Sequence, residues 1–277
     1  MDSFRRGDMV FDVRDGGPPE GEPVVLLHGF PQDSTAFDRM TPALHAAGLR
    51  TLAPDQRGYS PGARPVGRSH YRLRETVDDV LALLDAAGLE SAHVVGHDWG
   101  GGVAWALTSW HPGRVRTLTA LSTPHPAAMQ HATLHSDQAL RSWYMGFFQL
   151  PFLPETLLMA RGGAFLRRSL RNGGLPADRV DHYVDRLHEP DCLSGALNWY
   201  RALPWSVRDQ PVGSITVPTL HVWSTGDTYL GRTATDATAR FVDAPYRLEV
   251  LEDVPHWIPE LAPEETAALI TAHVTTA

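Results

Sequence analysis

An aspartate stands at the centre of a glycine-framed turn in the stretch GHDWGG, which runs from Gly96 to Gly101. Gly96, Asp98 and Gly100 form a G-x-D-x-G pattern, which is typical of a tight turn between a strand and a helix. Such a turn strains its central residue and tolerates only very small neighbours two positions away. The N–H groups that begin the following helix favour negative charge, so we expect Asp98 to stay ionised and to act as a nucleophile.

A carboxylate nucleophile restricts the class of substrate. Attack on an ester or amide carbonyl would give an activated anhydride, whereas displacement at an electrophilic sp³ carbon gives an ordinary alkyl ester. Epoxides and carbon–halogen bonds offer such carbons. Water must then cleave the ester, which requires a base.

Two downstream residues supply that base and the acid that orients it. Asp227 follows a strand-like segment in VWSTGDTYLG, and His256 follows the last strand-like segment in EDVPHWIPE. Taken singly, they would pass as a turn aspartate and a surface histidine. In the chain order nucleophile, acid, base, at successive strand ends, they predict a triad of Asp98, Asp227 and His256.

Hydrolysis of the ester also needs hydrogen-bond donors, because its carbonyl becomes a negatively charged tetrahedral centre. We expect one donor to be the backbone N–H of Trp99, directly after the nucleophile. The other is predicted to be the N–H of Phe30 in the stretch HGFP, which follows an earlier strand-like segment.

The elements that position these residues alternate between strand and helix patterns. Strand-like runs occupy 23–30, 50–55, 91–97, 115–123, 216–223 and 246–253. Helical spacing appears between them, as in Val77, Val80, Leu81 and Leu84 ahead of Gly88, and again over 232–242 and 262–274. The alternation predicts βαβ units around a mainly parallel sheet.

Strand signals vanish from about Pro126 to Val212, where helical spacing replaces them. An all-helical block between two strands of an α/β sheet predicts an inserted lid. We therefore divide the chain into a core domain, 1–125 and 213–277, and a helical lid, 126–212. A Pro/Gly-rich loop at 57–70 follows a strand at the edge where such sheets commonly bind ligands.

Composition excludes several classes of protein. The chain of 277 residues can form one large domain with an insertion, and its 24 Gly and 22 Pro are too few for low complexity. A net charge of −8 without a basic cluster argues against nucleic-acid or anionic-membrane partners. No apolar run approaches the roughly 18 residues of a membrane span, and no secretory pattern is evident at the start. We expect a cytoplasmic monomer or homodimer.

Neither a disulfide nor a metal site is indicated. The single cysteine, Cys192, is expected to be a buried, idle thiol. His131 and His135 lie four residues apart in HATLHSD, but no glutamate follows the first as in H-E-x-x-H and no third ligand is evident. We expect no metal and no other cofactor.

The stretches HGFP, GHDWGG and STPHP, a helical insert, Asp227 and His256 together resemble the α/β-hydrolase-fold epoxide hydrolases over nearly the whole chain. The resemblance implies a mostly parallel eight-stranded sheet flanked by helices, and the conversion of a small apolar epoxide and water into a vicinal diol. That family uses two lid tyrosines to hydrogen-bond the epoxide oxygen. The segments RSWYMGFFQLP and GALNWYRALP assign these roles to Tyr144 and Tyr200.

An aromatic-rich substrate pocket is also expected. Its predicted lining is Trp143, Phe147, Trp199 and Trp257, with Trp99 and Phe148 as further candidates. Packing inside the lid would explain the lid aromatics equally well.

Two other functions stay open. Haloalkane dehalogenases share the fold and the nucleophile, and Trp99 resembles their halide-binding tryptophan, although they usually carry Asn at the position of Phe30 and lack the tyrosine pair. Fluoroacetate dehalogenases resemble the chain through HGFP but typically carry Arg at the position of Trp99. A hydrolase scaffold that only binds a small apolar ligand is the other alternative, and the intact triad positions disfavour it.

Overall fold

The computed structural model describes residues 1–276, apart from the side chains of Val207 and Asp209, and these residues form one eight-stranded sheet. The strand order is β1 (Ser3–Arg6), β2 (Met9–Gly16), β4 (Leu49–Pro54), β3 (Glu22–Leu27), β5 (Ala92–His97), β6 (Val115–Leu121), β7 (Thr219–Ser224) and β8 (Tyr246–Leu251). β2 pairs antiparallel with β1 and β4, and all other pairs are parallel. The predicted α/β fold with a mostly parallel sheet is confirmed.

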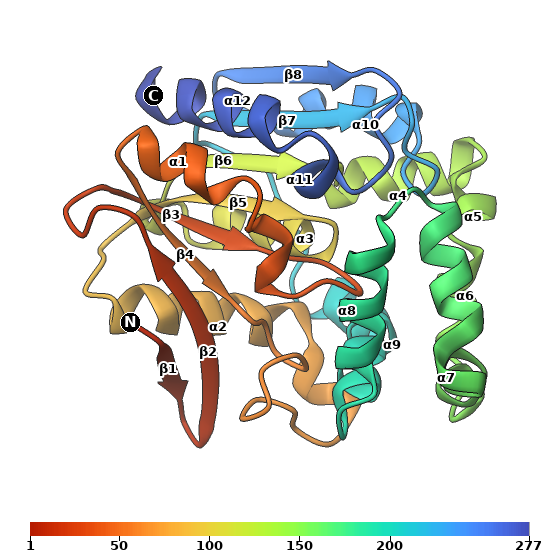
Figure 1. Cartoon of the computed structure of the whole chain (residues 1–277). Coiled ribbons are helices and arrows are strands. Elements are labelled where there is room, and N and C mark those ends of the chain that lie inside the picture. The colour runs from red at the N-terminus through yellow and green to blue at the C-terminus, as the bar shows by residue number, and fades with distance from the viewer. Residues whose placement is uncertain (277) are drawn as a thin grey trace.

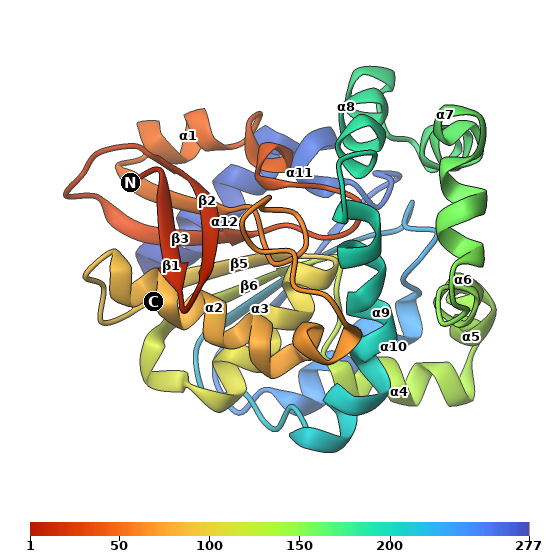
Figure 2. The ribbon, with the colours of Figure 1, turned by 90° about the horizontal axis from the view of Figure 1, so that it is seen from below.

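Helices cover both faces of the sheet (Figure 2). α1 (Thr41–Ala46) and α12 (Pro263–Thr276) lie on one face, and α2 (Leu73–Ala86) and α3 (Trp99–Trp110) lie on the other. Alternate residues of β3 point to opposite faces of the sheet. Val24 and Leu26 pack with α1 and α12, while Val25 and Leu27 pack with α2 and α3. Burial on both faces explains why the central strands are continuous apolar runs.

The hairpin formed by β1 and β2 was not among the expected strands. Its turn is at Gly7, where φ is +59°, and the rings of Phe4 and Phe11 stack across it with centroids 4.7 Å apart. Strand ends also differ from the expected ranges. The run 23–30 is a strand only to Leu27, so His28–Pro31 belongs to a loop.

Six helices between β6 and β7 lie beyond the carboxyl ends of the parallel strands (Figure 1). We call this segment, 126–209, the helical insert. Its helices are α4 (Pro126–His135), α5 (Gln138–Arg141), α6 (Trp143–Phe147), α7 (Leu153–Asn172), α8 (Ala177–Leu187) and α9 (Cys192–Asp209). The remaining helices are α10 (Arg232–Thr238), which packs against α4, and α11 (Ile258–Leu261).

Two sequence patterns within the insert have different outcomes. Val180, Tyr183, Val184 and Leu187 form the buried stripe of α8, as their spacing predicts. The stripe from Leu140 to Phe147 is instead split between α5 and α6, and Leu140 is 77% exposed. Cys192 is buried as expected, and burial raises the pKa of its thiol to about 11.

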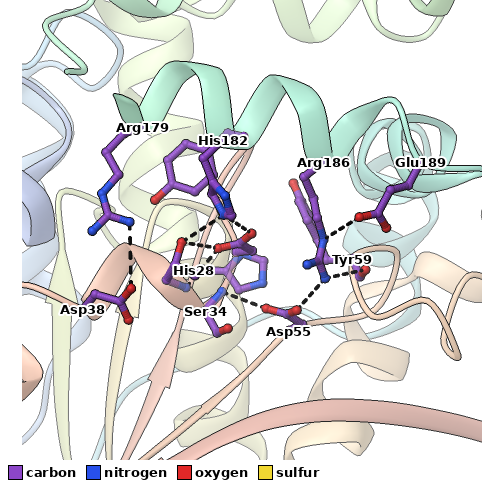
Figure 3. Close-up of polar contacts among 12 residues, drawn as sticks. His28, Ser34, Asp38, Asp55, Tyr59, Arg179, His182, Arg186 and Glu189 are labelled. Carbon is purple, nitrogen blue, oxygen red and sulfur yellow. Dashed lines mark hydrogen bonds and ion pairs between the residues drawn. The ribbon is translucent and has the colours of Figure 1, made fainter. Parts of the chain in front are cut away.

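A second face of α8, adjacent to its buried stripe, carries basic side chains that face aspartates of the core (Figure 3). Arg186 Nη2 lies 2.5 Å from Asp55 Oδ2, His182 Nε2 lies 2.8 Å from Asp33 Oδ2, and Arg179 Nη1 lies 3.9 Å from Asp38 Oδ2. We call these pairs the ionic seam. Within residues 1–276, no helix has the length and apolarity needed to cross a bilayer.

Candidate active site

The site lies where the strand order reverses, because β3 has β4 on one side and β5 on the other. Loops that leave β3 and β5 diverge at this point, which opens a crevice at the carboxyl ends of the strands. The loop after β3 carries Phe30, and the turn after β5 carries Asp98.

Asp98 occupies a strained turn between β5 and α3. Its φ is +51° and its ψ is −120°, and α3 begins at the next residue, Trp99. A Cβ on Gly96 would overlap the carbonyl of Gly100, and a Cβ on Gly100 would overlap the carbonyl of Leu27. The glycines therefore permit the close approach of β3, β5 and α3 that raises the Asp98 side chain out of the turn.

The Asp98 carboxylate is ionised and has two neighbours. Its Oδ1 accepts a hydrogen bond from the Phe30 N–H at 2.8 Å, and its Oδ2 lies 3.7 Å from His256 Nε2. Burial by itself would raise the pKa of Asp98, but His256 and the Phe30 N–H outweigh it, so that the pKa falls below its ordinary value. The carboxylate is 18% exposed.

His256 is bonded to Asp227 on its other ring nitrogen. His256 Nδ1 donates to Asp227 Oδ2 at 2.7 Å, and Asp227 Oδ1 accepts from the N–H groups of Tyr229 at 2.8 Å and Leu230 at 3.0 Å. Burial lowers the pKa of His256, but the Asp227 and Asp98 carboxylates raise it well above that of a free histidine. The three predicted triad residues thus meet in one place.

A cavity of about 820 Å³ opens above Asp98 and His256. Tyr144 of α6 and Tyr200 of α9 line it, and their ring centroids are 6.0 Å apart. Burial and the negative charge of Asp98 raise the pKa of both phenols. Both hydroxyls are therefore protonated at neutral pH and can donate hydrogen bonds.

Comparison with known proteins identifies the family. Residues 22–263 match the family model described as alpha/beta hydrolase fold. Epoxide hydrolase A of Mycobacterium tuberculosis is 34% identical, over 93% of this chain and 92% of its own. The AB hydrolase superfamily protein YfhM of Bacillus subtilis is also 34% identical, over 96% and 94%. The crystal structure of Epoxide Hydrolase A from Mycobacterium thermoresistibile has a TM-score of 0.86 and 26% identity, covering 99% of this chain and 97% of that one.

The chain belongs to the epoxide hydrolase family of the α/β-hydrolase fold. This confirms the family and the fold that HGFP, GHDWGG and the downstream residues predict. The cavity of this family member can be compared with the expected pocket residues. Trp143, Phe147, Phe148 and Trp257 line it.

Trp199 is the exception and needs a correction. Among the described residues that line the cavity, neither Trp199 nor the side chain of Trp99 is found. Trp199 Nε1 donates to the carbonyl of Arg57 at 2.8 Å, and its ring packs edge-on against Trp99 at 5.9 Å. Adjacent helical residues point about 100° apart, so α9 turns Tyr200 into the cavity and Trp199 behind it.

The loop 57–70 supports α9 rather than the cavity. Its later residues and the 3₁₀ turn Arg68–Tyr71 pack on α9, and Arg64 pairs with Glu189 at 2.6 Å, next to α9. None of the residues 57–70 lines the cavity in the part of the chain that the structure describes. The expected ligand contacts from this loop are therefore not found.

Residues that sequence reasoning missed hold the triad in place. The backbone carbonyl of His256 accepts hydrogen bonds from His97 Nε2 at 2.9 Å and Ser122 Oγ at 3.1 Å. Tyr229 lines the cavity and packs edge-on against His256 with ring centroids 5.1 Å apart. His97 and Ser122 stand in the motifs GHDWGG and STPHP, and these motifs were the available signals. Ser122 and Tyr229 lie in loops whose course depends on packing.

Proposed function

We propose that this chain is an epoxide hydrolase, which converts a small apolar epoxide and water into a vicinal diol through a covalent ester on Asp98. One observation carries the proposal: an ionised carboxylate, a buried histidine–aspartate pair and two protonated phenols converge on one apolar cavity. The names of the relatives support the same reaction.

In the first step, an oxygen of Asp98 attacks one epoxide carbon and the carbon–oxygen bond of the ring breaks. Tyr144 and Tyr200 donate hydrogen bonds to the departing oxygen, and one phenol gives it the proton that makes the first hydroxyl. The proton that the His256 imidazolium then gives up restores that phenol. The Asp98 charge that raises the pKa of both phenols is lost as the ester forms. The phenols therefore become better acids at the moment when the alkoxide needs a proton.

In the second step, His256 deprotonates a water that attacks the ester carbonyl of Asp98. Once Asp98 is esterified, it no longer raises the pKa of His256, so the imidazole can become neutral and act as a base. The negative charge on the carbonyl oxygen faces the Phe30 N–H, which already bonds Asp98, and the Trp99 N–H. Collapse breaks the bond between the carbonyl carbon and the ester oxygen. That oxygen takes the remaining proton of the attacking water and becomes the second hydroxyl, so the diol leaves, Asp98 returns to a carboxylate and His256 is again an imidazolium.

Dehalogenation by the same nucleophile is less well supported. A halide-binding role for Trp99 would require its ring in the cavity. The ring instead packs edge-on against Tyr200, with centroids 4.9 Å apart, and against Trp199 at 5.9 Å.

We also propose that 126–212 acts as a lid over a core domain of 1–125 and 213–277, because the helical insert supplies both tyrosines while the core supplies the triad. The cytoplasmic location and the monomeric or homodimeric state stay predictions.

The purified chain can be tested with styrene oxide and alkyl epoxides beside haloalkanes and haloacids. We expect diol from epoxides and no halide release; halide without diol would make the chain a dehalogenase, and binding without any product would leave only a binding scaffold. A single turnover in ¹⁸O-water then tests the ester. The label should enter Asp98 and not the diol of that first turnover, and its direct entry into the diol would exclude the ester.

A further inference from the structure

Gln138 is a fully buried amide at the start of α5, whereas Leu140 on the same short helix is 77% exposed. This reverses the usual order, in which the apolar side chains of a helix face the protein. Burying an amide costs free energy unless its polar atoms are hydrogen-bonded. The placement of Gln138 therefore depends on the partners that it reaches.

The first partners lie in the loop that follows the orienting acid Asp227. Gln138 Oε1 accepts a hydrogen bond from the Gly231 N–H at 2.9 Å, and Gln138 Nε2 donates to the Tyr229 carbonyl at 2.8 Å. Because an N–H only donates and a carbonyl only accepts, these partners fix the orientation of the amide. Gln138 thus binds both ends of the segment 229–231.

The same segment encloses the carboxylate of Asp227. The N–H groups of Tyr229 and Leu230 donate to Asp227 Oδ1 at 2.8 and 3.0 Å, while Asp227 Oδ2 accepts from His256. Tyr229 therefore uses its N–H on Asp227 and its carbonyl on Gln138. A shift of this segment would move Asp227 relative to the imidazole.

Gln138 also reaches the helix that carries Tyr144. Its Nε2 donates to Ser142 Oγ at 3.0 Å, and Ser142 directly precedes α6. Arg141 adds longer contacts from its Nη1 to the carbonyls of Asp227, at 3.3 Å, and Thr228, at 3.4 Å. The acid loop and the start of α6 are therefore joined through one buried amide.

We propose that Gln138 is a positioning residue for both steps of the reaction: it holds Asp227 against His256 and holds the start of α6, and with it Tyr144, against the acid loop. The inference rests on the proposed function, but it needs only a substrate that alkylates Asp98. Gln138 is not among the described residues that line the cavity, so it acts through its partners. A neutral amide does this without adding a charge beside the Asp227–His256 pair.

The experiment compares Gln138→Leu and Gln138→Met with Gln130→Leu in the full chain, using styrene oxide. Both Gln138 variants keep the approximate size of the side chain and remove its hydrogen bonds. Gln130 is exposed on α4 and serves as the matched control. The amount of alkylated Asp98 is measured by intact mass, and each rate is divided by that amount. A loss of folded protein then does not appear as a loss of rate.

We expect ester hydrolysis to slow at least about tenfold in both Gln138 variants, which is the lower end of the effect that loss of an outer hydrogen bond has at metal sites. The alkyl-enzyme then accumulates. The midpoint of the pH profile of hydrolysis should also move to lower pH, because a less well-placed Asp227 stabilises the imidazolium less. Gln130→Leu should match the wild type.

Unchanged hydrolysis per alkylated site, with an unchanged pH midpoint, would overturn the role in placing Asp227. Ser142→Ala tests the role of Gln138 at Tyr144, and it can be measured even if the Gln138 variants fail to fold. It should slow alkylation severalfold and leave hydrolysis unaltered, and equal alkylation rates would overturn the role at Tyr144. If the wild type forms no diol from any epoxide, the proposed function fails instead, and the same comparison is made with a bromoalkane that alkylates Asp98.

Discussion

The helical insert contacts the core along two seams, one made of ion pairs and the other of neutral hydrogen-bonding groups. The ionic seam on α8 joins Arg179, His182 and Arg186 to three aspartates, and these cations are partly exposed to water. The catalytic seam, formed by Gln138, Tyr144 and Tyr200, presents neutral hydrogen-bonding groups to the core loops that carry the triad. Arg141 also reaches this second seam, but it is paired with Asp137 at 2.8 Å.

The difference follows from the charges that each seam must preserve. None of the described residues that line the cavity belongs to the ionic seam, so opposite charges can attach the insert there without facing the substrate. Around Asp98 and His256, an added charge would change the pKa values on which both proposed steps depend. The ionic seam should therefore govern stability, and the catalytic seam should govern rate.

The largest effect is expected on the core side of the catalytic seam, from His256→Gln. Turnover of epoxides should fall about 10³-fold or more, because the water loses its base. Alkylation of Asp98 should continue, so that an adduct appears in the intact mass. Absence of an adduct with every epoxide that the wild type converts would contradict the two-step scheme.

The next largest effect is expected from the double change Tyr144→Phe and Tyr200→Phe. Loss of both donors should slow adduct formation by at least about 10²-fold, the size found for one lost oxyanion donor. The rate is best measured as adduct formation in a single turnover of the His256→Gln variant. Adduct formation as fast as in the His256→Gln variant alone would refute the assignment of these tyrosines.

On the ionic seam, Arg186→Leu should act on stability instead. Asp55 is only 8% exposed, so removal of its cation should lower the free energy of unfolding by about 3 kcal/mol in urea titrations. Activity per folded molecule should stay within about twofold. Arg232→Leu is the matched control, because Arg232 pairs with Asp236 at an exposed site on α10 and should change stability by less than about 0.5 kcal/mol. A large loss of activity per folded molecule in Arg186→Leu would remove the distinction between the seams.

The smallest effect is expected from His182→Ala, and it should depend on pH. The Asp33 hydrogen bond raises the pKa of His182 above 6.5, so this stabilisation is present below 6.5 and is lost as pH rises through the raised value. Burial raises the pKa of Asp33, but the hydrogen bonds from His182 and Thr35 outweigh it and bring that pKa below 3.8. The stabilisation that comes from ionised Asp33 is therefore lost only at a pH below 3.8. We expect a difference from wild type of about 1 kcal/mol near pH 6, discounted because His182 is 41% exposed, and close to zero at pH 9. A difference that is constant with pH, or one matched by His131→Ala, would contradict this pair.

The parts of the site that could be predicted are those fixed by short-range sterics. The spacing of Gly96 and Gly100 around Asp98 identifies the turn, because larger side chains would collide with neighbouring backbone. Asp227 and His256 follow strands whose apolar pattern is plain. The stripe of α8 was predictable because four apolar residues repeat at helical spacing.

The rest depends on how helices are rotated and where they break. Trp199 and Tyr200 are adjacent, and their sequence context does not decide which of them faces the cavity. The break between α5 and α6 was missed because the spacing of Leu140, Trp143 and Phe147 fits one continuous helix. Gln138 lies in a polar stretch, HSDQALRS, that gives no local sign of burial.

By itself, the sequence predicted the order of the proposed triad residues, and it determined the strained turn at Asp98, the parallel core and the family, since each depends on residues a few positions apart or on a strand and the residue that ends it. Tertiary structure alone decided the cavity lining, the ionic seam and the Gln138 contacts. Gln138 lies 91 residues from Tyr229, and Arg186 lies 131 residues from Asp55. Contacts over such separations form only when the insert packs against the core, and no local preference of the chain encodes which side chains then meet.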